Sequence, residues 1–180
     1  MSYKEINGDL IKLALDRKFD VIAHGCNCFC TMGAGIAPKM AKVFGCDKFG
    51  YEDKCFKGFI NKLGSIDYRS FVFTENELKI EKYIENSDLT VVNAYTQYSY
   101  GKNHKDGVDK PLDYEALTLC LRKINNIFKG KHIGLPGLIG CGLAGGKEEV
   151  VKEIIKKELK DCDVTIVYLN KWLKDVKFVI

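Results

Sequence analysis

Short apolar runs rich in β-branched residues alternate along this chain with segments of helical periodicity. The clearest run, residues 89–95, is continuously apolar, as expected for a strand that is covered on both faces. Strands that alternate with helices predict a layered α/β sandwich around a largely parallel or mixed sheet. The other expected strands are 21–23, 66–82 (a strand or a hairpin with Asn76 in its turn), 132–139 and 164–169.

Apolar residues spaced three and four positions apart predict the helices between these strands. Residues 35–44 form one such segment, with Ile36, Met40, Val43 and Phe44 facing inward. A second, less regular helix is expected over 47–63, ending near Gly64. Two further helices are expected over 113–129 and around 150–159.

The size and composition of the chain favour one globular domain. A length of 180 residues suits a single compact α/β domain, and we expect it to span residues 1–170, with 171–180 as a tail or edge strand. No apolar run approaches the roughly 20 residues of a membrane span, and the first residues lack a signal-peptide core. We therefore expect a cytoplasmic protein without a membrane partner. The net charge of +4 is mild and does not indicate a nucleic-acid-binding stripe.

Eight cysteines are spread through the expected core elements. Without a secretory signal they are expected to be reduced thiols that pack as small apolar groups. Cys26, Cys28 and Cys30 are separated by single residues, whereas structural zinc sites use a wider pair with a second pair elsewhere. We expect neither a metal nor a cofactor.

Two glycine-rich segments, 32–37 and 140–146, each follow an expected strand and lead toward a helix. Glycine lets the backbone approach a ligand closely, and such a turn presents N–H groups to an anion. Ligands of open α/β sheets bind beyond the carboxyl ends of the strands, so two such loops on neighbouring strands are suited to hold a diphosphate. Taken singly, either loop is better explained as a tight turn, because a glycine pattern alone is a weak signal. Neither has the dinucleotide or P-loop pattern.

Three motifs together resemble the macro domain family. They are Asn7-Gly-Asp-Leu10, the segment 24–37 with Asn27 and the Met32-Gly-Ala-Gly-Ile-Ala37 loop, and Gly140-Cys-Gly-Leu143. Within the family, the His24-Gly-Cys-Asn-Cys28 run is most similar to the branch of the ADP-ribose 1''-phosphate phosphatases and related phage and bacterial proteins. The resemblance implies a three-layer α/β/α sandwich with a mixed, largely parallel central sheet.

The resemblance also implies a ligand, ADP-ribose or ADP-ribose 1''-phosphate, and a role for each motif residue. Asp9 would accept a hydrogen bond from the adenine amino group, and Asn27 would contact the distal ribose. Gly33 and Gly35, with the N–H groups of Ile36 and Ala37, would hold the distal ribose and a phosphate. The diphosphate would be wrapped by Gly140, Cys141, Gly142 and Leu143.

Two departures bear on the reaction. A glutamyl-ADP-ribose hydrolase branch of the family uses a lysine after the middle strand and an aspartate after G-C-G-L, where this sequence has Gln97 and Ala144. Without those groups the lysine-dependent mechanism has no nucleophile. His24 is the alternative catalytic residue, since a histidine can activate water or protonate a leaving oxygen. It is equally well explained as a histidine at the end of a strand that serves packing.

Other side chains near the same end have a functional and a structural interpretation. One of Tyr95, Tyr98 and Tyr100 stacks on the ligand, or all three only cover the sheet. His104 and Asp106 are expected to be solvated loop residues, and His132 is expected to be structural, at the opposite end of its strand.

The sequence thus predicts a macro domain that hydrolyses an ADP-ribose derivative at its distal ribose, with ADP-ribose 1''-phosphate as the first candidate substrate. A non-catalytic reader of ADP-ribosylated macromolecules remains open. So does an enzyme that removes ADP-ribose from modified protein or nucleic acid, because the fold does not decide the reaction.

Overall fold

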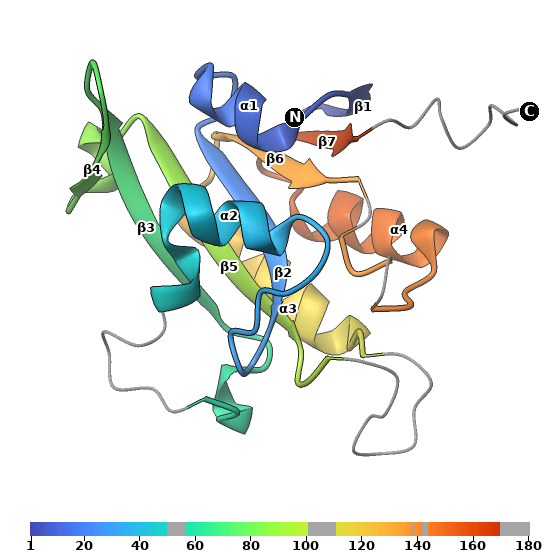
Figure 1. Cartoon of the computed structure of the whole chain (residues 1–180). Coiled ribbons are helices and arrows are strands. Elements are labelled where there is room, and N and C mark those ends of the chain that lie inside the picture. Colours follow the sequence, from blue (N-terminus) through green and yellow to red (C-terminus); the bar gives the residue numbers. More distant parts are fainter. Residues whose placement is uncertain (50–56, 101–110, 138, 142–143, 170–180) are drawn as a thin grey trace, which may run out of the picture.

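A computed structural model describes residues 1–49, 57–100, 111–137, 139–141 and 144–169 of the chain (Figure 1). In this part, seven strands form one sheet in the order β1-β7-β6-β2-β5-β3-β4. Their bounds are β1 Tyr3–Asn7, β2 Val21–Asn27, β3 Ile66–Phe73, β4 Leu78–Glu81, β5 Leu89–Gln97, β6 His132–Pro136 and β7 Asp163–Tyr168.

The sheet is mixed and largely parallel, as predicted. Strands β1, β7, β6, β2 and β5 run parallel to their neighbours, whereas β3 is antiparallel to β5 and β4 is antiparallel to β3. The antiparallel pair β3–β4 is a hairpin, and Asn76 lies in its turn, between Thr74 and Glu77, whose backbone groups are hydrogen-bonded. The parallel strands end along one edge of the sheet, so the segments that follow β2, β6 and β7 are brought close together.

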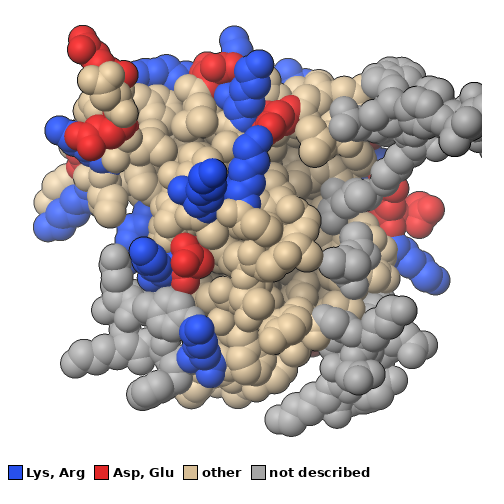
Figure 2. Space-filling model, in the orientation of Figure 1, with Lys and Arg blue, Asp and Glu red and all other residues tan. Residues whose placement is uncertain are grey.

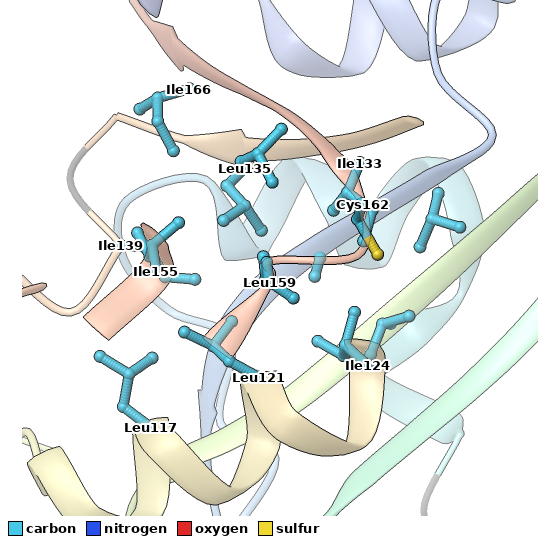
Figure 3. Packing of buried hydrophobic residues seen from close by; sticks show 14 of the residues in the cluster. Leu117, Leu121, Ile124, Ile133, Leu135, Ile139, Ile155, Leu159, Cys162 and Ile166 are labelled. Carbon is cyan, nitrogen blue, oxygen red and sulfur yellow. The ribbon is translucent and has the colours of Figure 1, made fainter. Parts of the chain in front are cut away.

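Helices cover both faces of the sheet, which gives the expected three layers (Figure 1). Helices α1 (Leu10–Leu15) and α2 (Ala37–Phe44) pack on one face through an apolar cluster that includes Ile11, Met40 and Phe44. Helices α3 (Tyr114–Ile127) and α4 (Glu148–Glu158) pack on the other face. Figure 3 shows this second cluster, with Leu117, Leu121 and Ile124 of α3 facing Ile155 and Leu159.

Local sequence signals account for where these helices begin and end. Asp9 caps α1 and Asp113 caps α3, because each side chain accepts hydrogen bonds from free amides of the first turn. Helix α2 carries Pro38 in its first turn and ends at Gly45, which has the left-handed conformation (φ 67°).

One predicted helix is wrong. Residues 47–63 were expected to form a second, less regular helix, but the described parts contain only the short 3₁₀ turns Cys46–Lys48 and Ile60–Lys62. Gly58 explains the difference, because it has φ +75° and its Cα lies against the Phe29 ring, where a Cβ would come within 2.5 Å. Strand β1 and helix α1 were not predicted. Residues 171–180 lie outside the described part, so the boundary at residue 170 stays a prediction.

Candidate functional site

A cavity of about 930 Å³ opens at the carboxyl ends of the parallel strands. Its walls come from the segments that follow β1, β2, β6 and β7 and from the start of α2, and they are mostly glycine and apolar side chains. Most of the residues predicted to bind a ligand line this one cavity: Asp9, Asn27, Gly33, Gly35, Ile36, Ala37 and Gly140. The two glycine loops therefore face the same space, although more than 100 residues separate them in the sequence.

Asn27, the last residue of β2, organises the first glycine loop. Its Oδ1 accepts hydrogen bonds from the amides of Phe29 (3.0 Å) and Thr31 (3.2 Å), and its Nδ2 donates to the Thr31 carbonyl oxygen (2.9 Å). The side chain is only 5% exposed. Asn27 thus shapes the loop in addition to lining the cavity, a role that sequence reasoning did not assign to it.

The loop that follows Thr31 offers unpaired backbone donors. The amides of Gly33, Ala34, Gly35 and Ile36 have no acceptor among the described residues, and all four residues line the cavity. Gly35 has φ +61°, a conformation that favours glycine. Such a run of N–H groups at the start of a helix favours an anion.

The Asp9 side chain joins the first turn of α1 to the first turn of α2. Its Oδ1 accepts from the amides of Ile11 (3.0 Å) and Lys12 (3.1 Å), and its Oδ2 lies 2.6 Å from the Nζ atom of Lys39. The Lys39 ammonium, helped by the two amides, holds the pKa of Asp9 below its usual value. Asp9 is therefore a helix cap and also a charged group of the cavity, so the two interpretations of this residue are compatible.

The second glycine loop is closely packed against the end of β6. Gly140 has φ +68°, and its carbonyl oxygen accepts from the amide of Gly146 (2.8 Å). A Cβ at Gly140 would approach the terminal carbons of Leu112 to 2.8 Å, so a side chain there would have to displace Leu112 as well as adopt an unfavourable φ. Cys141 packs against the core cluster below and does not line the cavity. Gly142 and Leu143 lie outside the described residues, so their predicted contacts with a diphosphate stay predictions.

His24 is not at the end of its strand, because β2 continues to Asn27. The ring is completely buried, and burial lowers its pKa to about 4. Nε2 lies 2.8 Å from the Oδ1 of Asn93, while Nδ1 has no partner among the described residues. His24 does not line the cavity. A direct catalytic role for His24 stays a prediction that this conformation does not support, since a ligand in the cavity would not meet the ring.

The three tyrosines after the middle strand separate into different roles. Tyr100 lines the cavity and is 57% exposed. Tyr98 donates to the Gly58 carbonyl oxygen and packs edge-on against Phe29. Tyr95 is fully buried and donates to the Oδ2 of Asp67 (2.7 Å). Only Tyr100 is thus placed to stack on a ligand.

A polar cluster of Lys62, Asp67 and Tyr95 contacts the segment that leads from β2 to the first glycine loop. Asp67 Oδ2 accepts from Tyr95 and also lies 2.8 Å from the Nζ of Lys62, whose side chain is 7% exposed. The Tyr95 hydroxyl is 3.6 Å from the Sγ of Cys30, in the loop between Asn27 and Thr31. Burial, with the Asp67 carboxylate, raises the pKa of Tyr95 far above its usual value. This cluster fixes the base of the loop.

Sequence reasoning missed one wall of the cavity. Tyr168, the last residue of β7, lines it, and the ring lies so close to Gly137 that a Cβ there would approach a ring carbon to 2.3 Å. The Tyr168 hydroxyl donates to Glu148 (2.8 Å), and burial raises the pKa of Tyr168 to about 12. The available signal was positional, since residues that end neighbouring parallel strands share the ligand edge of the sheet.

His132 was correctly predicted to lie away from the site. It begins β6, at the opposite end of the strand from the cavity, and its Nε2 lies 2.8 Å from the Oγ1 of Thr165. His104 and Asp106 fall in the segment 101–110, outside the described residues. Within the described ranges, no group of three or more His, Cys, Asp or Glu side chains is arranged to hold a metal ion. No helix there is long and apolar enough to cross a membrane.

Comparisons with known proteins agree with this architecture. No protein-family model matches the chain. An uncharacterised 17.5 kDa protein from the tk–vs intergenic region of Enterobacteria phage T4 is 31% identical over 173 residues, covering 93% of this chain and 96% of that protein. A protein of unknown function from Bacteroides thetaiotaomicron is 24% identical, with a TM-score of 0.66 over 94% of this chain and 99% of that chain.

Two further solved structures have the same architecture at lower identity. The macrodomain of Thermus aquaticus DarG is 18% identical, with a TM-score of 0.61 over 92% of this chain and 97% of that chain. Thermosipho africanus DarTG in complex with ADP-ribose is also 18% identical, with a TM-score of 0.67 over 95% of this chain and 42% of that one. The chain belongs to the family of the phage protein and has the macrodomain fold.

Both residues at which the sequence resemblance predicts a departure from the lysine-dependent hydrolases line the cavity. They are Gln97, whose Nε2 donates to the Ser99 carbonyl oxygen (2.8 Å), and Ala144. Among the described lining residues, the only carboxylate is Asp9 and the only ammonium is Lys39. The described wall therefore contains no free acid–base pair near the first glycine loop.

Proposed function

We propose that this macrodomain binds the ADP-ribose moiety in the cavity at the ends of β2, β6 and β7. The observation that carries the proposal is that both glycine loops and Asp9 line one cavity of about 930 Å³. An anionic diphosphate suits the unpaired amides of the first loop, and the purine amino group suits the carboxylate of Asp9. The ADP-ribose complex of Thermosipho africanus DarTG, which shares this fold, supports the same ligand.

The proposed orientation follows the chemistry of the walls. The adenine lies at the Asp9 end, and Tyr168 with its neighbour Leu169 supplies apolar surface beside it. The distal ribose lies against Asn27, Gly33 and Gly35. The diphosphate lies between them, held by the unpaired amide of Ile36 and by the loop that starts at Gly140. The amide of Ala37 already donates to the Ala34 carbonyl oxygen (3.3 Å).

The binding proposal is tested by calorimetric titration with ADP-ribose, AMP and ribose 5-phosphate. ADP-ribose should bind far more tightly than either fragment, because only the whole ligand fills both loops. Equal affinities for ADP-ribose and AMP would contradict the proposed placement of the distal ribose. Absence of ADP-ribose binding at millimolar concentration would contradict the proposal itself.

Two enzymatic activities are alternatives to a protein that binds ADP-ribose without catalysis. The resemblance to the phosphatase branch favours hydrolysis of ADP-ribose 1''-phosphate, whereas the binding cavity by itself also suits a reader of ADP-ribosylated macromolecules. Removal of ADP-ribose from modified protein or nucleic acid is the third candidate. A phosphate-release assay run beside a de-ADP-ribosylation assay distinguishes the three, and His24→Gln in both assays tests the histidine. Tight ADP-ribose binding without turnover of any substrate identifies the reader.

A further inference from the structure

The ammonium of Lys39, on the described part of the cavity wall, is bound to Asp9. Lys39 Nζ lies 2.6 Å from Asp9 Oδ2, and no other Lys or Arg lines the cavity among the described residues. The pair joins the start of α1 to the first turn of α2. Figure 2 shows Lys and Arg side chains over the surface that α1 and α2 form.

The ion pair occupies the acceptor that a ligand would use. Oδ1 of Asp9 already accepts from the two amides that begin α1. Oδ2 is therefore the oxygen left for an incoming N–H donor, and Lys39 is bound to it. A base that approaches Asp9 must share this oxygen with the ammonium or displace it.

Displacement is easy for this particular lysine. The Lys39 side chain is 56% exposed, and an exposed ion pair is weak because water competes for both partners. The ammonium ends a flexible four-carbon stem and can reach a new partner without any backbone movement. Its backbone is three residues from Ile36, whose unpaired N–H we place against a phosphate, so the diphosphate lies within reach.

From these contacts we infer that Lys39 is a specificity-determining residue that exchanges Asp9 for the diphosphate when ADP-ribose binds. The exchange frees Oδ2 of Asp9 for the adenine amino group and gives the diphosphate the cation that Asp9 binds in the structure. Ligands with both an adenine and a diphosphate complete the exchange, whereas an uncharged nucleoside must compete with Lys39. The inference rests on the proposed function.

The test compares two ligands on the whole chain. Lys39→Met keeps the stem and removes the charge, and Lys42→Met is the matched control because Lys42 is exposed on the same helix and does not line the cavity. Lys39→Met should raise the Kd for ADP-ribose by about tenfold, as expected for the loss of a charge-assisted contact. The Kd for adenosine, followed by NMR titration, should stay the same or fall. Lys42→Met should change neither.

Salt gives a second readout. The affinity of the wild type for ADP-ribose should fall more steeply with ionic strength than that of Lys39→Met, because the exchanged contact is screened. Equal weakening of ADP-ribose and adenosine would mean that Lys39 only braces Asp9, and unchanged ADP-ribose affinity would mean that it stays clear of the ligand. Either result overturns the inference while leaving ADP-ribose binding by the wild type intact. Failure of the wild type to bind ADP-ribose would instead overturn the proposed function.

Discussion

The imidazole of His24 donates its Nε2 proton to the side-chain oxygen of Asn93, at 2.8 Å, within the core of the sheet. The direction of the bond follows from Asn93, whose Nδ2 donates to the Cys46 carbonyl oxygen (2.8 Å), so that its Oδ1 must accept. Neutral His24 satisfies this arrangement. A second proton on the ring would place a charge in a fully buried position, at an Nδ1 atom without an acceptor among the described residues.

His24 should therefore make the fold sensitive to acid. Its pKa falls from 6.5 to about 4 on folding, so the unfolded chain binds the proton more tightly within that range. Stability from this group is present above pH 6.5 and is lost as the pH falls toward 4. The loss should reach about 3 kcal/mol.

His24→Gln keeps a donor for Asn93 and tests this prediction. It should lack the acid-dependent loss of stability in urea denaturation measured from pH 7 to 4. His132→Gln is the control and should keep the wild-type response. Identical profiles for wild type and His24→Gln would refute the buried neutral ring.

Asp9 should act on ligand affinity and on stability through different atoms. Asp9→Asn keeps an oxygen that can cap α1, so its stability should change by less than about 1 kcal/mol, the typical value of an exposed ion pair. Its affinity for ADP-ribose should nevertheless fall by about 1–3 kcal/mol, because the carboxylate is lost. Asp9→Ala should also lose about 1 kcal/mol of stability with the cap.

Asp113→Asn provides the matched control for this pair of variants. Asp113 caps α3 through Ala116 and does not line the cavity, so this variant should bind ADP-ribose like the wild type. Calorimetry for binding and thermal melts for stability separate the two effects. Wild-type affinity in a folded Asp9→Asn variant would reduce Asp9 to a helix cap.

Continuous, strongly patterned elements were predictable from sequence, whereas the two short elements at the start of the chain were not. Strand β5 has nine residues, of which the first eight are buried, and α3 presents one apolar face over fourteen residues. Strand β1 has five residues and α1 has six, too few for either period to be distinct. The false helix over 47–63 arose because helical spacing of apolar residues carries no information on the contact between Gly58 and Phe29.

The residues of the candidate site likewise divide into those that the sequence predicts and those that it does not. Motif residues such as Asn27 and Gly35 lie on the cavity because the loops that carry them follow parallel strands, which is a topological rule that sequence can apply. Lys39 could not be found in this way, since its partner Asp9 is thirty residues away and only the packing of α2 beside α1 brings them together. Burial of His24 was equally invisible, because it depends on how far β2 extends and on what covers that face.

Gly33 should separate ligand contact from folding. A Cβ at Gly33 would meet nothing within 4 Å, and its backbone lies outside the left-handed region, so Gly33→Val should fold with a stability within about 0.5 kcal/mol of the wild type. The added side chain should still lower ADP-ribose affinity severely, because Gly33 lines the cavity. Gly35→Val, at φ +61°, should lose about 1–2 kcal/mol of stability as well. A folded Gly33→Val variant with full affinity would show that this loop does not border the ligand.

Lys62 and Asp67 should be strongly coupled, because each leaves the other buried when it is removed. The side chain of Lys62 is 7% exposed and that of Asp67 is 23% exposed, with 2.8 Å between Nζ and Oδ2. Lys62→Met and Asp67→Asn should each destabilise the fold by about 3 kcal/mol, the cost of breaking a buried pair from one side. The double variant should be markedly more stable than the sum of the two single effects predicts, because no uncompensated charge remains. Chemical denaturation of the four proteins measures this coupling, and strictly additive effects would contradict it.

Tyr95→Phe tests the same cluster in another way, because it removes only the hydroxyl that joins Asp67 to Cys30. That variant should loosen the loop between Asn27 and Thr31, seen as faster amide exchange at Phe29 and Thr31, and should lose about 1.5–3 kcal/mol of global stability with the hydrogen bond to the carboxylate.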